Sequence, residues 1–78
     1  MMNILDLFSG IGGISLGLES TGAFQTVCFC EIDPYCQKVL KKHWPDVPCI
    51  DDVRKITKEV LLQEAGVDTV DVLTAGFP

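Results

Sequence analysis

The sequence predicts an α/β fold in which a parallel sheet is joined by crossover helices. Short apolar runs alternate with helical patterns, in the order strand, helix, strand, helix, strand, helix, strand. A glycine-rich turn follows the first apolar run, as it does where a strand leads into a helix in this class. The chain is 47% hydrophobic and 22% charged, a composition that suits a folded core and not a disordered segment.

The first unit is a strand, a turn and a helix. Residues 3–8 form an apolar run that reads as a strand, and residues 9–13 form the glycine-rich turn. Residues 14–21 follow as a helix, because apolar residues recur one helical turn apart and Gly22 supplies a stop. We therefore expect the glycines to lie at the carboxyl end of the first strand.

The second unit has the clearest boundaries. Residues 24–32 are rich in β-branched and aromatic residues, which favour a strand. Asp33 and Pro34 predict a helix start, because aspartate is a good N-cap and proline suits the first helical position. Pro45 ends the helix that follows.

The last part of the chain predicts two short strands around a helix. Residues 48–50 form a possible third strand and residues 70–75 a fourth. Residues 57–65 predict a helix, with Thr57 as its cap and Gly66 just past its end. Ligands of parallel sheets bind beyond the carboxyl ends of the strands, so the residues that follow each strand are the candidate site.

Length and charge limit the function. A chain of 78 residues forms at most one small domain, which is marginally stable because it buries only about 60% of its unfolded surface. The net charge of -5 argues against a freestanding nucleic-acid binder. The basic residues lie together in the sequence and form either solvated faces or a local phosphate-facing patch: Lys38, Lys41, Lys42, Arg54, Lys55 and Lys58.

Membrane, secretory and metal-binding functions have no support in the sequence. No apolar stretch approaches about 18 residues, and the first residues lack the basic start of a secretory signal. The four cysteines form no Cys-x-x-Cys pair of the kind that holds zinc. We expect them to be reduced and largely buried, with no metal bound.

The glycine-rich turn is the first candidate binding element. Its glycines let the backbone turn tightly and approach a ligand, and the helix start beyond them can receive a phosphate or a carboxylate. The dinucleotide pattern Gly-x-Gly-x-x-Gly is not met, because Ser15 occupies the third glycine position. A purely structural turn is the alternative.

Acidic residues follow the second and third strands. Glu31 lies nineteen residues beyond Gly12, a spacing at which a carboxylate can accept hydrogen bonds from ribose hydroxyls. Asp51 and Asp52 follow the third strand, where a carboxylate could receive an adenine amino group. Capping of a neighbouring helix or loop is the alternative in each case. The turn and Glu31 together predict a nucleoside site.

Four segments of the chain contain the glycine-rich turn, the acidic residues and the end of the last strand: residues 6–13 (DLFSGIGG), 31–36 (EIDPYC), 52–53 (DV) and 74–78 (TAGFP). In this order and spacing they resemble the motifs of a known family, the cytosine-5 DNA methyltransferases. The resemblance covers nearly the whole chain and implies a partial Rossmann-like fold for an S-adenosylmethionine-dependent methyltransferase. Residues 1–78 would then be the N-terminal part of its catalytic, cofactor-binding domain, truncated just before the catalytic cysteine.

By resemblance, ten residues surround S-adenosylmethionine: Phe8, Ser9, Gly10, Gly12, Gly13, Glu31, Ile32, Asp52, Gly76 and Pro78. Phe8 would pack against the cofactor and the turn after it would surround the methionine portion. Glu31 would hold the ribose hydroxyls. Ile32 would pack on adenine and Asp52 would accept from its amino group. The two C-terminal residues of the set would line the pocket near the transferable methyl.

The implied reaction methylates carbon 5 of cytosine in DNA. A cysteine thiolate adds to carbon 6 of a base flipped out of the duplex, and carbon 5 then takes the methyl group. The resemblance places this cysteine directly after Pro78, and none of the four cysteines present matches that motif. We therefore expect the chain to supply most of a cofactor site and to be inactive by itself.

The resemblance also implies partners and a setting. Double-stranded DNA would be bound mainly by the missing part of the enzyme, and the partial sheet would favour self-association or a complementing fragment. The setting would be the cytoplasm of a bacterium, at the nucleoid, with the gene encoded by the bacterium or a phage and a role in restriction-modification. Three alternatives remain: a non-catalytic remnant or part of a split enzyme, an RNA cytosine-5 methyltransferase, and a dinucleotide-binding fragment.

Overall fold

A computed structural model describes residues 1–75, which form one four-stranded parallel sheet. The strand order is β3-β2-β1-β4, so the first two strands lie at the centre. The strands are β1 (Met2–Leu7), β2 (Phe24–Cys30), β3 (Cys49–Ile50) and β4 (Val72–Ala75). The α/β class, the parallel sheet and the crossover connections predicted from the sequence are confirmed.

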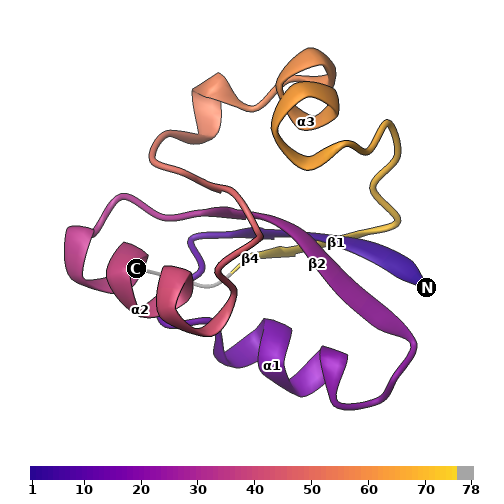
Figure 1. The fold of residues 1–78 in the computed structure, drawn as a ribbon, viewed down its shortest axis with the longest axis horizontal. Coiled ribbons are helices and arrows are strands. Elements are labelled where there is room, and N and C mark those ends of the chain that lie inside the picture. Colours follow the sequence, from indigo (N-terminus) through magenta and orange to yellow (C-terminus); the bar gives the residue numbers. More distant parts are fainter. Residues whose placement is uncertain (76–78) are drawn as a thin grey trace.

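The helices cover both faces of the sheet. They are α1 (Gly13–Glu19), α2 (Pro34–His43) and α3 (Lys58–Ala65), with a short 3-10 helix η1 (Val53–Lys55) before α3. In Figure 1, α1 and α2 lie on one face of the sheet and α3 lies on the other. Among the described residues, none of these helices has the length and apolar character needed to cross a membrane.

The predicted helix caps are confirmed. Asp33 Oδ1 accepts hydrogen bonds from the backbone N–H groups of Tyr35 and Cys36 at 2.8 and 3.4 Å. Thr57 Oγ1 accepts one from the N–H of Val60 at 3.1 Å. These local bonds explain why the starts of α2 and α3 could be located from the sequence.

The ends of the first two strands were predicted too far along the chain. β1 stops at Leu7, because Phe8 adopts a left-handed backbone with φ of 52° that a strand cannot contain. β2 stops at Cys30, so Glu31 and Ile32 belong to the loop that leads to α2. Both changes move predicted site residues out of the strands and into loops.

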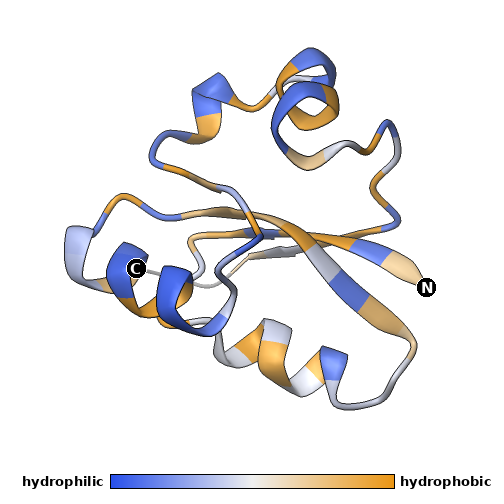
Figure 2. Ribbon diagram, viewed as in Figure 1, coloured by the Kyte–Doolittle hydropathy of each residue, from blue (hydrophilic) through white to orange (hydrophobic). Residues whose placement is uncertain are grey.

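The core is apolar and lies between the central strands and the helices. Among the residues with under 2% exposure are Ile4, Phe29, Leu40 and Cys28. Figure 2 shows hydrophilic residues along the outer side of α2, whereas α1 is apolar or neutral until Glu19 at its end. Cys28 and Cys30 are buried as expected, and the four thiols are all free.

Candidate functional site

The carboxyl ends of the three strands β1, β2 and β3 meet at one edge of the sheet, around a cavity of about 170 Å³. Four of the residues predicted to hold a cofactor line this cavity: Phe8, Glu31, Ile32 and Asp52. The remaining lining residues are Cys30, Asp51, Val53 and Arg54. The topology therefore brings together side chains from three separate loops, as the site prediction requires.

Glu31 connects the two ends of this site. Its Oε1 accepts a hydrogen bond from the N–H of Gly10 at 2.7 Å, and its Oε2 accepts one from the N–H of Asp33 at 2.8 Å. The side-chain amide of Gln37 donates to the backbone carbonyl of Glu31 at 2.6 Å and so supports the loop from α2. Each carboxylate oxygen can accept more than one hydrogen bond, so both can also receive hydroxyl groups from the cavity.

The glycine turn is held by backbone hydrogen bonds and begins at a residue with an unusual backbone angle. The N–H of Ser9 donates to the carbonyl of Cys30 at 3.1 Å, and the N–H of Gly12 donates to the carbonyl of Ser9 at 2.9 Å. Phe8 has a positive φ of 52°, which is uncommon for a residue with a side chain. A Cβ atom built on Gly10 or Gly13 would meet nothing within 4 Å, so the backbone is open to a ligand there.

Two apolar side chains stand at the surface beside Glu31. Ile32 is 78% exposed and Phe8 is 45% exposed, although both are large and hydrophobic. Ile32 is largely uncovered by the described chain, and nearly half of Phe8 is accessible. Together they offer apolar contact to a flat group bound next to the carboxylate.

Asp52 has a local partner that the sequence analysis did not foresee. Its carboxylate pairs with Arg54 at 2.7 Å and accepts from the Arg54 N–H at 2.9 Å, so it caps η1. These hydrogen bonds lower the pKa of Asp52 to about 2. The capping role that the sequence left open is confirmed, and the contact with an adenine amino group stays a prediction.

Asp6 was missed by the sequence analysis. It lies on β1 directly before the turn and is only 1% exposed. Its Oδ2 accepts a hydrogen bond from Ser15 at 2.6 Å, while its Oδ1 has no partner among the residues that the structure describes. Burial raises the pKa of Asp6, and the bond from Ser15 only partly opposes this. A lone acid within an apolar strand was the signal that could have marked it.

Gly76 and Pro78 cannot be assigned a place in the site, because they lie outside the described residues. The nearest described residue is Ala75 at the end of β4, which lies opposite Leu7 in the β1–β4 register. β4 therefore brings the end of the described chain to the same edge as the turn.

Comparison with known proteins identifies the family. The family model for the C-5 cytosine-specific DNA methylases matches residues 2–78. The chain belongs to this family. It is 42% identical over 77 residues to the Type II methyltransferase M2.BsuMI of Bacillus subtilis, and 40% identical over 78 residues to M.Bsp6I of a Bacillus species.

Two solved structures have the same fold as this chain. A putative DNA modification methyltransferase from an Escherichia coli prophage matches with a TM-score of 0.79 and 29% identity, over 100% of this chain. A DNMT2 structure from Spodoptera frugiperda matches with a TM-score of 0.77 over 96% of this chain, and at 23% identity it supports the fold alone.

This C-5 methylase chain is short beside its relatives. The match to M2.BsuMI includes 99% of this chain but 18% of that protein, and the match to M.Bsp6I includes 100% of this chain but 23% of that protein. It likewise spans 23% of the prophage methyltransferase structure. The matches therefore compare about a fifth of each relative.

The cysteines of this methylase chain are not activated. Burial and neighbouring charges raise the pKa of Cys28 to about 12 and that of Cys49 to about 11. Burial is also the largest cause that raises the pKa of Cys30 and of Cys36. All four are protonated at neutral pH, and a protonated thiol is a poor nucleophile.

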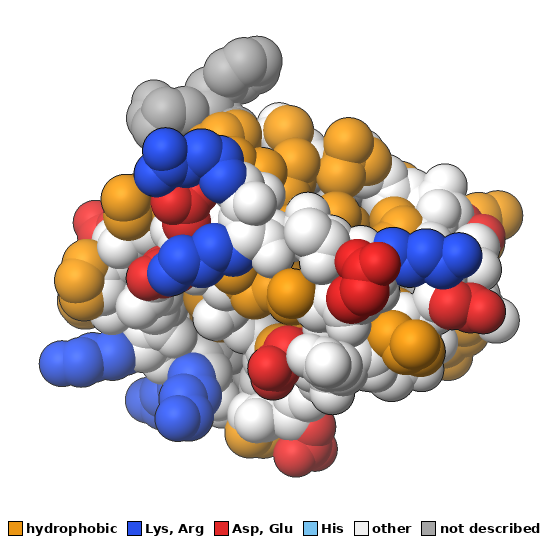
Figure 3. Space-filling view, turned by 90° about the horizontal axis from the view of Figure 1, so that it is seen from above, with side chains coloured by type: hydrophobic (Ala, Val, Ile, Leu, Met, Phe, Trp, Pro, Cys, Tyr) orange, Lys and Arg blue, Asp and Glu red, His pale blue; other side chains and the backbone are white. Residues whose placement is uncertain are grey.

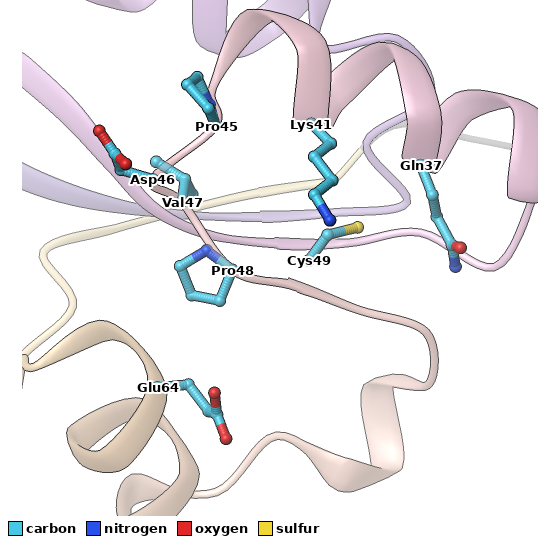
Figure 4. Close-up of a pocket in the computed structure, with 8 residues that line it drawn as sticks. All are labelled: Gln37, Lys41, Pro45, Asp46, Val47, Pro48, Cys49 and Glu64. Atoms are coloured by element: carbon cyan, nitrogen blue, oxygen red, sulfur yellow. The ribbon is translucent and has the colours of Figure 1, made fainter.

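A second, larger cavity lies away from the predicted residues. It measures about 380 Å³ and lies between α2, β3 and α3. In Figure 4, Lys41 points from α2 toward Cys49, and Glu64 reaches toward the cavity from α3. It contains none of the residues that the sequence predicts for the cofactor, so the smaller cavity at the strand ends is the candidate site.

The basic residues near the site are paired with acids. Lys55 contacts Asp51 at 2.9 Å and Arg54 contacts Asp52 at 2.7 Å. Figure 3 shows acidic and basic side chains adjacent to each other on the face seen from above. For these two residues, solvated ion pairs describe the structure better than a phosphate-facing patch does.

Proposed function

We propose that this chain forms the cofactor side of a DNA (cytosine-5) methyltransferase and binds S-adenosylmethionine at the ends of β1, β2 and β3. The arrangement of Glu31 is the observation that carries this proposal. Its carboxylate is held in place by the N–H groups of Gly10 and Asp33, at the mouth of a cavity with exposed apolar walls.

The residues present fit the chemistry of this cofactor. The carboxylate of Glu31 can accept both ribose hydroxyls while keeping its two backbone bonds. Ile32 and Phe8 offer apolar contact to the adenine ring, and Asp52 lies in the same cavity.

In the proposed reaction, the bound cofactor supplies an electrophilic methyl group for carbon 5 of cytosine. This chain's residues bind and orient that cofactor. The cysteine that adds to carbon 6 has no counterpart among the four thiols, which burial keeps protonated. We therefore propose that the chain binds the cofactor and by itself transfers no methyl group.

The proposed setting follows from the relatives. M2.BsuMI and M.Bsp6I are Type II methyltransferases of bacteria, and the Type II methyltransferase M.CviJI of a Chlorella virus is 42% identical over 74 residues. We propose a bacterial or phage-encoded enzyme that acts on double-stranded DNA at the nucleoid, with residues 1–78 as the start of its catalytic domain. DNA contacts would come mainly from other parts of the enzyme or from a complementing fragment, and the chain alone would self-associate. A non-catalytic remnant is the alternative.

Isothermal titration calorimetry of the 78-residue chain tests the binding proposal. We expect S-adenosylmethionine to bind and NAD to bind far more weakly. Glu31→Gln should weaken binding roughly 10- to 100-fold, because hydrogen bonds to a charged group are worth about 1.5–3 kcal/mol. Glu59→Gln is the matched control, since Glu59 is an exposed acid in the first turn of α3.

Two outcomes would contradict the proposal. Tighter binding of NAD than of S-adenosylmethionine would favour a dinucleotide-binding fragment, and equal affinities for the Glu31→Gln and Glu59→Gln variants would remove Glu31 from the site. Incubation with DNA and cofactor carrying a labelled methyl group tests the second part. Labelled cytosine in that DNA would show that the chain is active alone.

A further inference from the structure

Trp44 packs directly beneath the glycine turn, although it belongs to the end of α2. A Cβ atom built on Gly12 would lie 2.7 Å from Trp44 Cζ3 and 2.9 Å from Cη2, so close that the indole or the turn would have to shift. Gly12 also has a left-handed φ of 88° and is the N-cap of α1. The indole ring therefore occupies the space that a side chain at position 12 would need.

The position of the indole is itself fixed by Glu19. Trp44 Nε1 donates a hydrogen bond to Glu19 Oε1 at 2.9 Å, and Glu19 Oε2 accepts one from the N–H of Thr26 at 2.9 Å. Thr26 lies on β2 next to an irregularity in its register with β1. On its other side, the indole packs edge to face on Phe29, with 5.0 Å between ring centroids.

Side chains of α2 and its C-cap lie closest to Gly12. After the two indole atoms, the next nearest atom to the position of its missing Cβ is Leu40 Cδ2, at 3.0 Å. A cavity of about 380 Å³ borders the turn and the indole, with Ile11, Leu16 and Val39 among its lining residues. A shorter side chain at position 44 would therefore enlarge this cavity beside the turn.

We propose that Trp44, oriented by Glu19, is a positioning residue that sets the glycine turn for the amino-acid portion of the cofactor. This inference rests on the proposed function. The turn carries the N–H of Gly10 that holds Glu31, and the N–H of Gly12 closes the turn on Ser9 at 2.9 Å. Movement of the turn would therefore disturb the amino-acid portion most, because Glu31 on the ribose side keeps its second backbone bond, from the N–H of Asp33.

The test compares two ligands that share adenosine and differ in the amino acid. S-adenosylhomocysteine contains the amino-acid portion and adenosine lacks it. Trp44→Phe keeps an aromatic ring but loses the N–H, and Glu19→Gln keeps the shape but loses the charge that serves both donors. We expect each substitution to weaken the binding of S-adenosylhomocysteine about three- to tenfold and to change the binding of adenosine by less than about twofold.

The control is Ile4→Val, a buried change on β1 that lowers stability without altering the turn. It should leave the ratio of the two affinities unchanged. An equal loss for both ligands in Trp44→Phe and Glu19→Gln, or no loss in either, would overturn the positioning role. A double-mutant cycle sharpens the result. Gly12→Ala should weaken the binding of S-adenosylhomocysteine less in the Trp44→Ala background than in the parent chain.

A ligand-free measurement separates this inference from the proposed function. If the parent chain binds neither ligand, the cofactor proposal fails. Amide hydrogen exchange at Gly10 and Gly12 then decides the positioning role. We expect faster exchange at both amides in Glu19→Gln than in Ile4→Val, and equal rates would overturn it.

Discussion

The two halves of this molecule are packed very differently. Among the described residues, every fully buried side chain lies within residues 4–40, which hold most of β1 and α2 and all of α1 and β2. Residues 41–75 contain β3, α3 and β4, and their side chains are half-buried or exposed, none of them fully buried. Leu62 and Leu73 in this second part are 55% and 62% exposed.

The difference follows from position in the sheet and not from hydrophobicity. β1 and β2 each have a parallel neighbour on both sides, whereas β3 and β4 are edge strands with one neighbour each. Apolar residues of an edge strand have fewer atoms to pack against. The candidate site joins the two regions: Glu31 is anchored to the packed half, while Asp52 is held by an ion pair near the surface.

The largest expected effect on stability comes from shortening a side chain of the buried core. Phe29→Ala should lower the free energy of unfolding by about 3–5 kcal/mol, because Phe29 is fully buried and packs on Trp44. Leu73→Ala, the comparison in the exposed half, should change it by less than about 0.5 kcal/mol. Urea unfolding followed by circular dichroism measures both. Similar losses would mean that the two halves are equally packed.

A pair of glycines gives the next effect. Gly12 and Gly66 have left-handed φ values of 88° and 71°, but only Gly12 has atoms close to its missing Cβ. Gly66→Ala should cost about 1–2 kcal/mol from backbone strain alone. Gly12→Ala should cost at least about 1 kcal/mol more, from contact with Trp44. Equal costs in urea unfolding would show that the turn has room to relax.

Two acids should respond to pH in opposite directions. The pKa of Asp6 is raised by burial above the ordinary 3.8, so its contribution to stability is complete below that value and is lost as pH rises through the raised pKa. Asp6→Asn should remove this loss. The free energy of unfolding of the variant minus that of the parent should therefore increase as pH rises from 4 to 7. A difference that is independent of pH would contradict the raised pKa.

The smallest effect concerns Asp52 in the exposed half. Its pKa is lowered to about 2, mainly by hydrogen bonds from Arg54, so the stabilising contribution of the pair is present above 3.8 and is lost as pH falls toward 2. Arg54→Ala should return the pKa of Asp52 toward 3.8, with little change in stability at neutral pH. Carbon NMR of the side-chain carboxyl groups measures this, with Lys55→Ala as the control that leaves the Arg54 bonds in place.

Much of the fold could be predicted because its signals are local. The starts of α2 and α3 follow from Asp33 and Thr57, whose side chains bond to N–H groups two or three residues away. The order of strands and helices follows from short-range patterns of apolar residues. The ends of β1 and β2 were harder to predict, since the left-handed angle of Phe8 has no signature in its residue type.

The sequence by itself determined the family, the α/β class and the loops that carry the candidate site, because family motifs, caps and strand patterns are written in adjacent residues. Only the tertiary structure decided how those loops are held. The contact of Trp44 with Gly12, the bond from Ser15 to Asp6 and the clamp of Gly10 on Glu31 each join residues that folding alone brings together. Such contacts depend on the packing of helices on a sheet, which no local pattern of residues specifies.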